Sequence, residues 1–167
     1  NVELNVCSST EIYGKKFDSV LGKKYEGLFN ECKNTKNVNY FGFLKNEKII
    51  EQLKKIHIFA HPSIWPETSC IAAIESMAAG CEVVTTNLGA LNETCSPFGK
   101  MINFEKRPED LEIKYSEALL DSIKNFWSDT TQKKLKLQRE TINATYSWDV
   151  RSIEWKKFFD EAKKLKT

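Results

Sequence analysis

The amino-acid sequence predicts an α/β fold, in which a parallel sheet carries helices on both faces and a helical tail follows at the carboxy terminus. Short apolar runs alternate with longer segments of helical periodicity as far as residue 104, and this alternation is typical of parallel sheets. From residue 108 onward only helical patterns follow. The hydrophobic content of 41% is that of a globular protein.

The short apolar runs are predicted as strands at residues 2–8, 38–41, 57–60, 82–86 and 100–104. Periodic segments are predicted as helices at residues 18–33, 47–55, 69–79, 108–127, 130–145 and 148–164. Turn residues separate these elements at Gly42, at His61-Pro62-Ser63 and at Asn87-Leu88-Gly89. Gly80 is predicted to end the helix over 69–79 as a left-handed capping glycine. Ile71, Ile74 and Met77 or Ala78 are expected to pack that helix onto the sheet.

Composition and charge exclude several classes of protein. The net charge is +2, without the concentrated basic face of a nucleic-acid-binding protein. No apolar run approaches the roughly 20 residues needed to span a bilayer. The five cysteines are an odd number without a Cys-x-x-Cys pair, which predicts reduced thiols and no metal site. We expect a cytoplasmic protein, with peripheral membrane contact through its carboxy-terminal lysines as an alternative to a simple solvated helix face.

The segment from Pro66 to Gly80 carries the clearest functional signal. Glu67 lies just before a predicted helix start, and Glu75 lies inside that helix. In parallel sheets ligands bind beyond the carboxyl ends of the strands, and the helix that follows offers free N–H groups to an anion. Carboxylates there can accept hydrogen bonds from sugar or ribose hydroxyls. In the alternative interpretation, Ser69 caps the helix and both glutamates are ordinary solvated side chains.

The order of motifs resembles the carboxy-terminal domain of the group 1 (family 4) retaining glycosyltransferases, which have the GT-B fold. The motifs are a strand, His61-Pro62-Ser63, Pro66-Glu67, the eight-residue step to Glu75, Ala78-Ala79-Gly80, an apolar strand and Leu88 to Glu93. The resemblance covers residues 1–104, and Tyr146-Ser147-Trp148 is similar to the family's closing helix. It implies a Rossmann-like, carboxy-terminal GT-B half that binds a nucleotide-diphospho-sugar donor.

The resemblance also implies roles for individual residues. Glu67 would face the donor sugar as the catalytic residue, and Glu75 would hold the ribose. The donor-binding residues by this resemblance are Glu75, Thr68, Ser69, Cys70, Ile71, Gly42, Phe43, Leu44 and His61. Thr68 to Ile71 would contact the sugar and diphosphate through backbone amides, and Gly42 to Leu44 would edge the nucleobase. The family usually has glycine where Cys70 stands. His61 either lines the donor pocket or hydrogen-bonds locally around Pro62.

The domain prediction is one donor-binding domain over residues 1–167, with 108–167 as its helical closing segment. We expect a piece of a longer protein that lacks a first strand and an acceptor-binding domain, so that the isolated chain is inactive and a bare sheet edge favours self-association. Lys15 and Lys16 would either replace a missing diphosphate clamp or lie in solvent. The expected reaction is sugar transfer to a glycan, lipid or polysaccharide without a cofactor or metal. The alternatives are a sugar-nucleotide epimerase of the same fold and a non-catalytic binding module.

Overall fold

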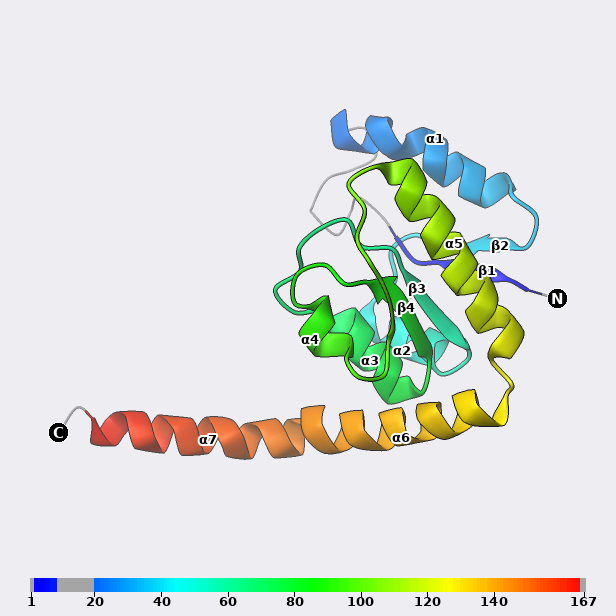
Figure 1. Ribbon diagram of the computed structural model, residues 1–167. Helices are drawn as coiled ribbons and strands as arrows, with labels where there is room; N and C mark the ends of the chain where they lie inside the picture. The colour runs from blue at the N-terminus through cyan, green and yellow to red at the C-terminus, as the bar shows by residue number, and fades with distance from the viewer. Residues whose placement is uncertain (1, 9–19, 166–167) are drawn as a thin grey trace. The chain divides into compact units, whose positions relative to one another are not determined.

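Parallel strands and the helices between them form the fold, as a computed structural model shows (Figure 1). The structure describes residues 2–8 and 20–165. Contacts divide the chain into two units, residues 1–52 and residues 53–167.

The first unit contains a pair of parallel strands. Strand β1 (Leu4–Val6) pairs with β2 (Val38–Tyr40), and helix α1 (Val20–Asn34) connects them. The ring of Phe29 on α1 lies 5.5 Å from the ring of Tyr40, measured between centroids. This aromatic contact packs α1 against β2. Helix α2 (Asn46–Leu53) follows β2 after the Gly42 turn.

The second unit contains a three-stranded parallel sheet in the order β3-β4-β5. Its strands are β3 (Ile58–His61), β4 (Glu82–Thr86) and β5 (Lys100–Ile102). All five residues of the central strand β4 are buried. Val83 and Val84 supply its apolar contacts, and the buried Glu82, Thr85 and Thr86 are polar. Burial on both faces is expected because helices cover both sides of a parallel sheet.

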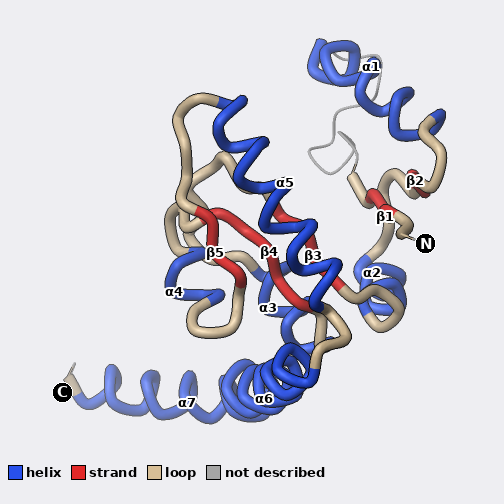
Figure 2. The backbone as a smooth tube through the Cα atoms, turned by 45° about the vertical axis from the view of Figure 1, so that its right-hand side comes forward, coloured by secondary structure: helices blue, strands red, loops and turns tan. Residues whose placement is uncertain are grey.

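Helices pack against the two faces of this sheet, because successive strand residues point to opposite sides. On one side, α3 (Ile71–Ala79), α4 (Leu91–Cys95) and α6 (Asp129–Tyr146) contribute to a core that includes Val83. On the other side, α5 (Pro108–Asn125) buries Leu111 and Tyr115 against Val84. Figure 2 shows α5 crossing one face of β3, β4 and β5.

Helix α6 holds the carboxyl end of α3 through hydrogen bonds. The fully buried Gln138 side chain donates from Nε2 to the carbonyl oxygens of Met77 at 3.2 Å and Cys81 at 2.8 Å. Asn143 Nδ2 donates to the Ala78 carbonyl oxygen at 3.0 Å. These hydrogen bonds fix α6 to the last turn of α3 and to Cys81, the residue that precedes β4.

The last helix, α7 (Trp148–Lys164), extends beyond the sheet (Figure 1), and none of its described residues is buried. Trp155, Phe158 and Phe159 form an exposed aromatic cluster with centroid distances of 5.5 to 5.8 Å. Within the described part of the chain, no helix has both the length and the apolar character to cross a membrane.

The predicted fold class is confirmed: parallel strands are flanked by helices, and a helical tail follows. The predicted bounds of β4 and α7 agree with the structure. Some details of the prediction are wrong. Ile71 does not pack α3 onto the sheet, since it is 67% exposed, whereas Met77 is fully buried. The short helix α4 occupies a segment for which no helix is predicted.

Candidate functional site

The loop after β3 begins the candidate site, and hydrogen bonds from β4 hold its first residues. Thr85 Oγ1 donates to the carbonyl oxygen of His61 at 2.8 Å, and Thr86 Oγ1 donates to that of Ser63 at 2.7 Å. Both threonines are fully buried. The backbone that leaves the carboxyl end of β3 is therefore fixed to the neighbouring strand, and His61 is held at the end of β3 where ligands bind in parallel sheets.

Glu67 is held at this same end by a backbone bridge to Gly89. The two residues form an isolated parallel bridge, and the Ala90 N–H donates to the Glu67 carbonyl oxygen at 2.7 Å. Gly89 has a φ of +60°, and an added Cβ would lie 2.7 Å from both the nitrogen and the carbonyl oxygen of Glu67. Only glycine fits this left-handed position at such a close approach. The turn after β4 therefore sets the position of the Glu67 backbone.

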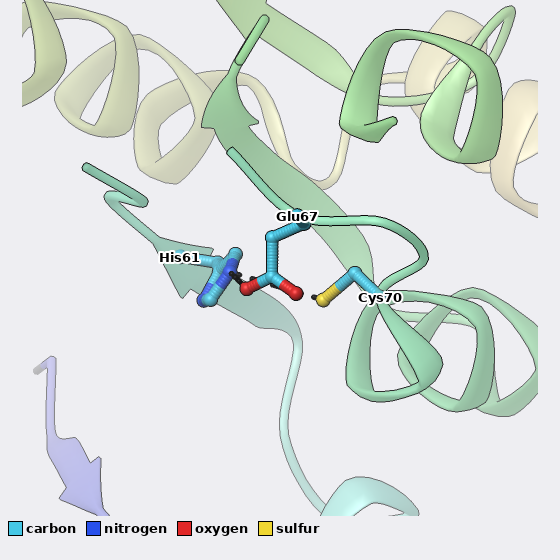
Figure 3. Close-up of side chains that lie close together, drawn as sticks. All are labelled: His61, Glu67 and Cys70. Carbon is cyan, nitrogen blue, oxygen red and sulfur yellow. Dashed lines mark hydrogen bonds and ion pairs between the residues drawn. The ribbon is translucent and has the colours of Figure 1, made fainter. Parts of the chain in front are cut away.

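His61, Glu67 and Cys70 bring their side chains together, as Figure 3 shows. The Nε2 atom of His61 lies 3.5 Å from Oε1 of Glu67 and 3.8 Å from Sγ of Cys70. The three potential ligand atoms all lie within 4.8 Å of one another. The His61 and Glu67 side chains are 27% and 28% exposed, whereas Cys70 is 4% exposed. We call these three residues the His-Glu-Cys cluster.

Helix α3 begins beside this cluster, two residues later than predicted. Cys70 is the N-cap residue with extended backbone angles (φ −108°, ψ 91°). The first helical hydrogen bonds run from the N–H groups of Ala73 and Ile74 to the Cys70 carbonyl oxygen, both at 3.1 Å. The N–H groups of Ile71 and Ala72 precede them and belong to the helix turn that attracts anions. The amino-terminal end of α3 thus starts at Ile71, and Ser69 lies outside the helix.

The surroundings of Cys70 change the pKa of its thiol. Burial raises its pKa above the ordinary value of 9.0, the backbone N–H of Ala73 opposes this shift, and the charge of Glu67 adds to it. At neutral pH the Cys70 thiol beside Glu67 is therefore neutral. A cation that binds the sulfur would have to displace this proton.

The remaining predicted residues of the second unit lie along the same segment. Thr68 and Ser69 are exposed between Glu67 and the start of α3, and Glu75 is half-buried in its second turn. Gly80 ends α3 as predicted, with a φ of 95° and its N–H donating to the Met77 carbonyl oxygen. Their proposed ligand contacts stay predictions.

In the first unit, Gly42, Phe43 and Leu44 line a pocket of about 300 Å³ together with Cys7, Asn46 and Ile49. Gly42 adopts a φ of +65°, which glycine reaches without steric cost. The segment predicted to edge the nucleobase is thus concave. Lys15 and Lys16, the predicted substitutes for a diphosphate clamp, lie outside the described residues.

Sequence reasoning found the members of the His-Glu-Cys cluster separately but missed their convergence. The sequence predicts that His61 either lines the donor pocket or hydrogen-bonds locally around Pro62. It also shows a cysteine at position 70, where the family usually has glycine. The usable signal was the short spacing of His61, Glu67 and Cys70 across a strand end and a helix start. Such spacing favours convergence, because a strand end and the next helix start meet at one edge of a parallel sheet.

The second unit is therefore an α/β domain with polar side chains at the carboxyl ends of its strands. The family described as "Glycosyl transferases group 1" matches residues 11–144, and the chain belongs to this family. A sugar donor and an acceptor are therefore its substrates in general terms. No curated protein sequence matches the chain.

Proposed function

We propose that this chain is the donor-binding domain of a retaining, family 4 glycosyltransferase of the GT-B fold. Its donor would be a nucleotide-diphospho-sugar and its acceptor a glycan, lipid or polysaccharide. The observation that carries the proposal is the placement of Glu67: its backbone is bridged to Gly89, and its carboxylate lies beside the first turn of α3 and remains 28% exposed. A carboxylate fixed in this way can meet a ligand whose anionic group lies at the helix start.

The charges at the site suit the cleavage of a glycosidic bond to a diphosphate. Positive charge develops on the sugar ring and negative charge on the leaving diphosphate. In the proposal Glu67 orients the sugar and stabilises the positive charge, while the N–H groups at the start of α3 stabilise the diphosphate. The helix start supplies this stabilisation, so the proposed reaction needs no metal ion.

Glu75 has a separate proposed role. It lies one helical turn beyond the start of α3 and is half-buried, and its neighbours Ala72, Ala78 and Ala79 leave space for a ligand. A carboxylate can accept hydrogen bonds from both hydroxyls of a ribose. Holding the ribose there would fix the diphosphate, and hence the reacting bond, at the helix start.

The two roles are tested by separate measurements. A panel of nucleotide-diphospho-sugars is first screened against the 167-residue chain by thermal shift, and the best ligand is titrated calorimetrically. Glu75→Ala should weaken binding about tenfold or more, because charge-assisted hydrogen bonds contribute about 1.5–3 kcal/mol. Glu112→Ala, on an exposed position of α5, should bind as the unchanged chain does. Equal affinity for Glu75→Ala would remove its assigned role.

Turnover is measured in a protein that joins this chain to an acceptor-binding domain. Glu67→Ala should lower kcat about 100-fold or more while changing donor affinity much less, because its interactions strengthen as charge develops. Retention of the sugar's anomeric configuration in the product, read by NMR, is the expected stereochemical result. A product with inverted anomeric configuration, or an unchanged kcat in Glu67→Ala, would contradict the proposed mechanism.

A further inference from the structure

We propose that the His-Glu-Cys cluster binds one thiophilic divalent cation, with Zn²⁺ as the best fit. Imidazole, carboxylate and thiolate are the three ligand types that Zn²⁺ takes in proteins. A thiolate together with an imidazole favours zinc over Mg²⁺ or Ca²⁺, which prefer oxygen ligands. This proposal departs from the expectation, drawn from the sequence, that the chain has no metal site.

Two of the three distances within the cluster suit a shared cation, and the ligand atoms of Glu67 and Cys70 lie within 4.8 Å of each other. The 3.5 Å between His61 Nε2 and Glu67 Oε1 exceeds the distance of about 2.7–3.2 Å of an N–H···O hydrogen bond. Zinc bonds of about 2.0–2.3 Å at tetrahedral angles separate N and O ligands by roughly 3.4 Å and N and S ligands by roughly 3.6 Å. The observed 3.5 Å and 3.8 Å lie within a few tenths of these values.

The protein holds each ligand in place before a cation arrives. The His61 ring stacks on Phe59 at a centroid distance of 5.6 Å and an interplanar angle of 12°. The Glu67 backbone is fixed by its bridge to Gly89, and Cys70 belongs to the buried core under α3. Ligands on such packed supports lose little freedom on binding, which favours metal affinity.

Charge and access also favour a cation here. The carboxylate of Glu67 and a thiolate of Cys70 would together neutralise a divalent ion, while His61 would bind through its neutral ring. Binding would release the thiol proton of Cys70 to solvent. The partial exposure of His61 and Glu67 leaves a route from solvent and a fourth position for water. The expected site is therefore three protein ligands with one open position.

The metal site shares Glu67 with the proposed donor site. The competition between metal and donor therefore rests on the proposed function. A cation bound by His61, Glu67 and Cys70 would take the carboxylate that the donor sugar needs. Zn²⁺ and the nucleotide-diphospho-sugar should then exclude one another. Metal binding itself can be measured without any donor, so the two proposals fail separately.

The test is a Co²⁺ titration of the Cys7→Ser, Cys32→Ser chain, which lacks the two thiols that are not buried. A saturable one-to-one thiolate-to-cobalt absorption band in the near ultraviolet is expected, and Zn²⁺ should bleach it. Cys70→Ser should abolish the band, and His61→Gln should weaken Co²⁺ binding about tenfold or more. Cys81→Ser, which removes a buried thiol outside the cluster, should retain the band.

A missing band, or an equal band in Cys70→Ser, would overturn the metal site. Far-UV circular dichroism establishes that each variant folds, and His61→Gln decides the question if Cys70→Ser does not. The calorimetric titration with the best nucleotide-diphospho-sugar is then carried out with and without saturating Zn²⁺. Each chain is compared with itself: Zn²⁺ should lower donor affinity in the parent chain, and it should lower it much less in Cys70→Ser relative to that variant's own affinity without Zn²⁺. A metal site that leaves donor affinity unchanged would stand, and it would contradict the donor role of Glu67 instead.

Discussion

Gly89 controls the position of Glu67, and its substitution should show how tightly the site is held. Gly89→Ala would place a Cβ 2.7 Å from the backbone nitrogen and carbonyl oxygen of Glu67. Backbone atoms cannot move aside as the end of a flexible side chain can. We expect a loss of about 2–4 kcal/mol in the free energy of unfolding, from left-handed strain together with overlap. The measurement is urea unfolding followed by tryptophan fluorescence, since all four tryptophans lie in the second unit.

Gly80→Ala is the matched control for Gly89→Ala. Gly80 also has a positive φ, of +95°, but an added Cβ would meet only the flexible Arg139 side chain, at 3.6 Å. Its cost should be the left-handed strain alone, about 1–2 kcal/mol. Equal losses in the two variants would mean that the approach of Gly89 to Glu67 adds nothing.

The buried thiol of Cys81 predicts a loss of stability in alkaline solution. Burial raises its pKa from 9.0 to about 11, so the folded state keeps its proton after the unfolded state has lost it. The contribution of the Cys81 thiol to the free energy of unfolding is therefore fully present below pH 9, and it is lost as pH rises from 9 to 11. Cys81→Ala should reduce the fall in unfolding free energy between pH 8 and pH 10.5 by about 2 kcal/mol.

Urea unfolding at the two pH values measures this difference, and Cys32→Ala serves as the comparison. Cys32 lies in the first unit, so its removal leaves the Cys81 contribution in place. The pH-dependent fall should stay at its full size in Cys32→Ala. If Cys81→Ala shows the same fall as the unchanged chain, then the Cys81 thiol does not carry the effect.

At the scale of elements, Gln138 joins α6 to the end of α3. Gln138→Ala would leave the carbonyl oxygens of Met77 and Cys81 without this donor in a fully buried place. We expect a loss of about 2–4 kcal/mol in the free energy of unfolding, from lost hydrogen bonds and a cavity. Leu137→Ala, at the neighbouring position that is 57% exposed, should change it by about 0.5 kcal/mol or less. Similar losses in both variants, by the same fluorescence-monitored urea unfolding, would refute the role of Gln138.

The elements also show how far the sequence alone could lead. The bounds of β4 were predictable because the β-branched run from Val83 to Thr86 follows the helix-ending Gly80 and stops at the turn Asn87-Leu88-Gly89. The start of α3 was not, because Glu67 is paired with Gly89, far along the chain, and Cys70 has extended backbone angles, so that the helix begins only at Ile71. Helix α4 has five residues, too few to show a period of 3.6.

Part of the candidate site could likewise be predicted from the sequence, and part could not. Glu67 and Glu75 could be selected from their spacing around a predicted helix start. The convergence of His61 and Cys70 on Glu67 could not, because it depends on how the loop between β3 and α3 closes. That closure is set by Thr85, Thr86 and Gly89, which belong to β4 and its following turn. Contacts of this kind are tertiary, and local patterns do not encode them.

At the scale of the whole molecule, the second unit should fold without the first. Both core clusters, on the two faces of the β3-β4-β5 sheet, lie within residues 53–167. A chain of this size with its own core can fold independently. Residues 53–167 expressed alone should therefore unfold cooperatively in urea, with coincident transitions in tryptophan fluorescence and far-UV circular dichroism.

A substitution in the core decides whether that shorter chain has native packing. Leu91 is fully buried, so Leu91→Ala should destabilise residues 53–167 by about 2–5 kcal/mol. Leu120→Ala, at a position 53% exposed on α5, should have little effect. A gradual, non-cooperative transition, or equal effects of the two substitutions, would show instead that residues 1–52 are needed to form the core. Cooperative folding would place all three ligands of the proposed metal site in a domain that can be titrated by itself.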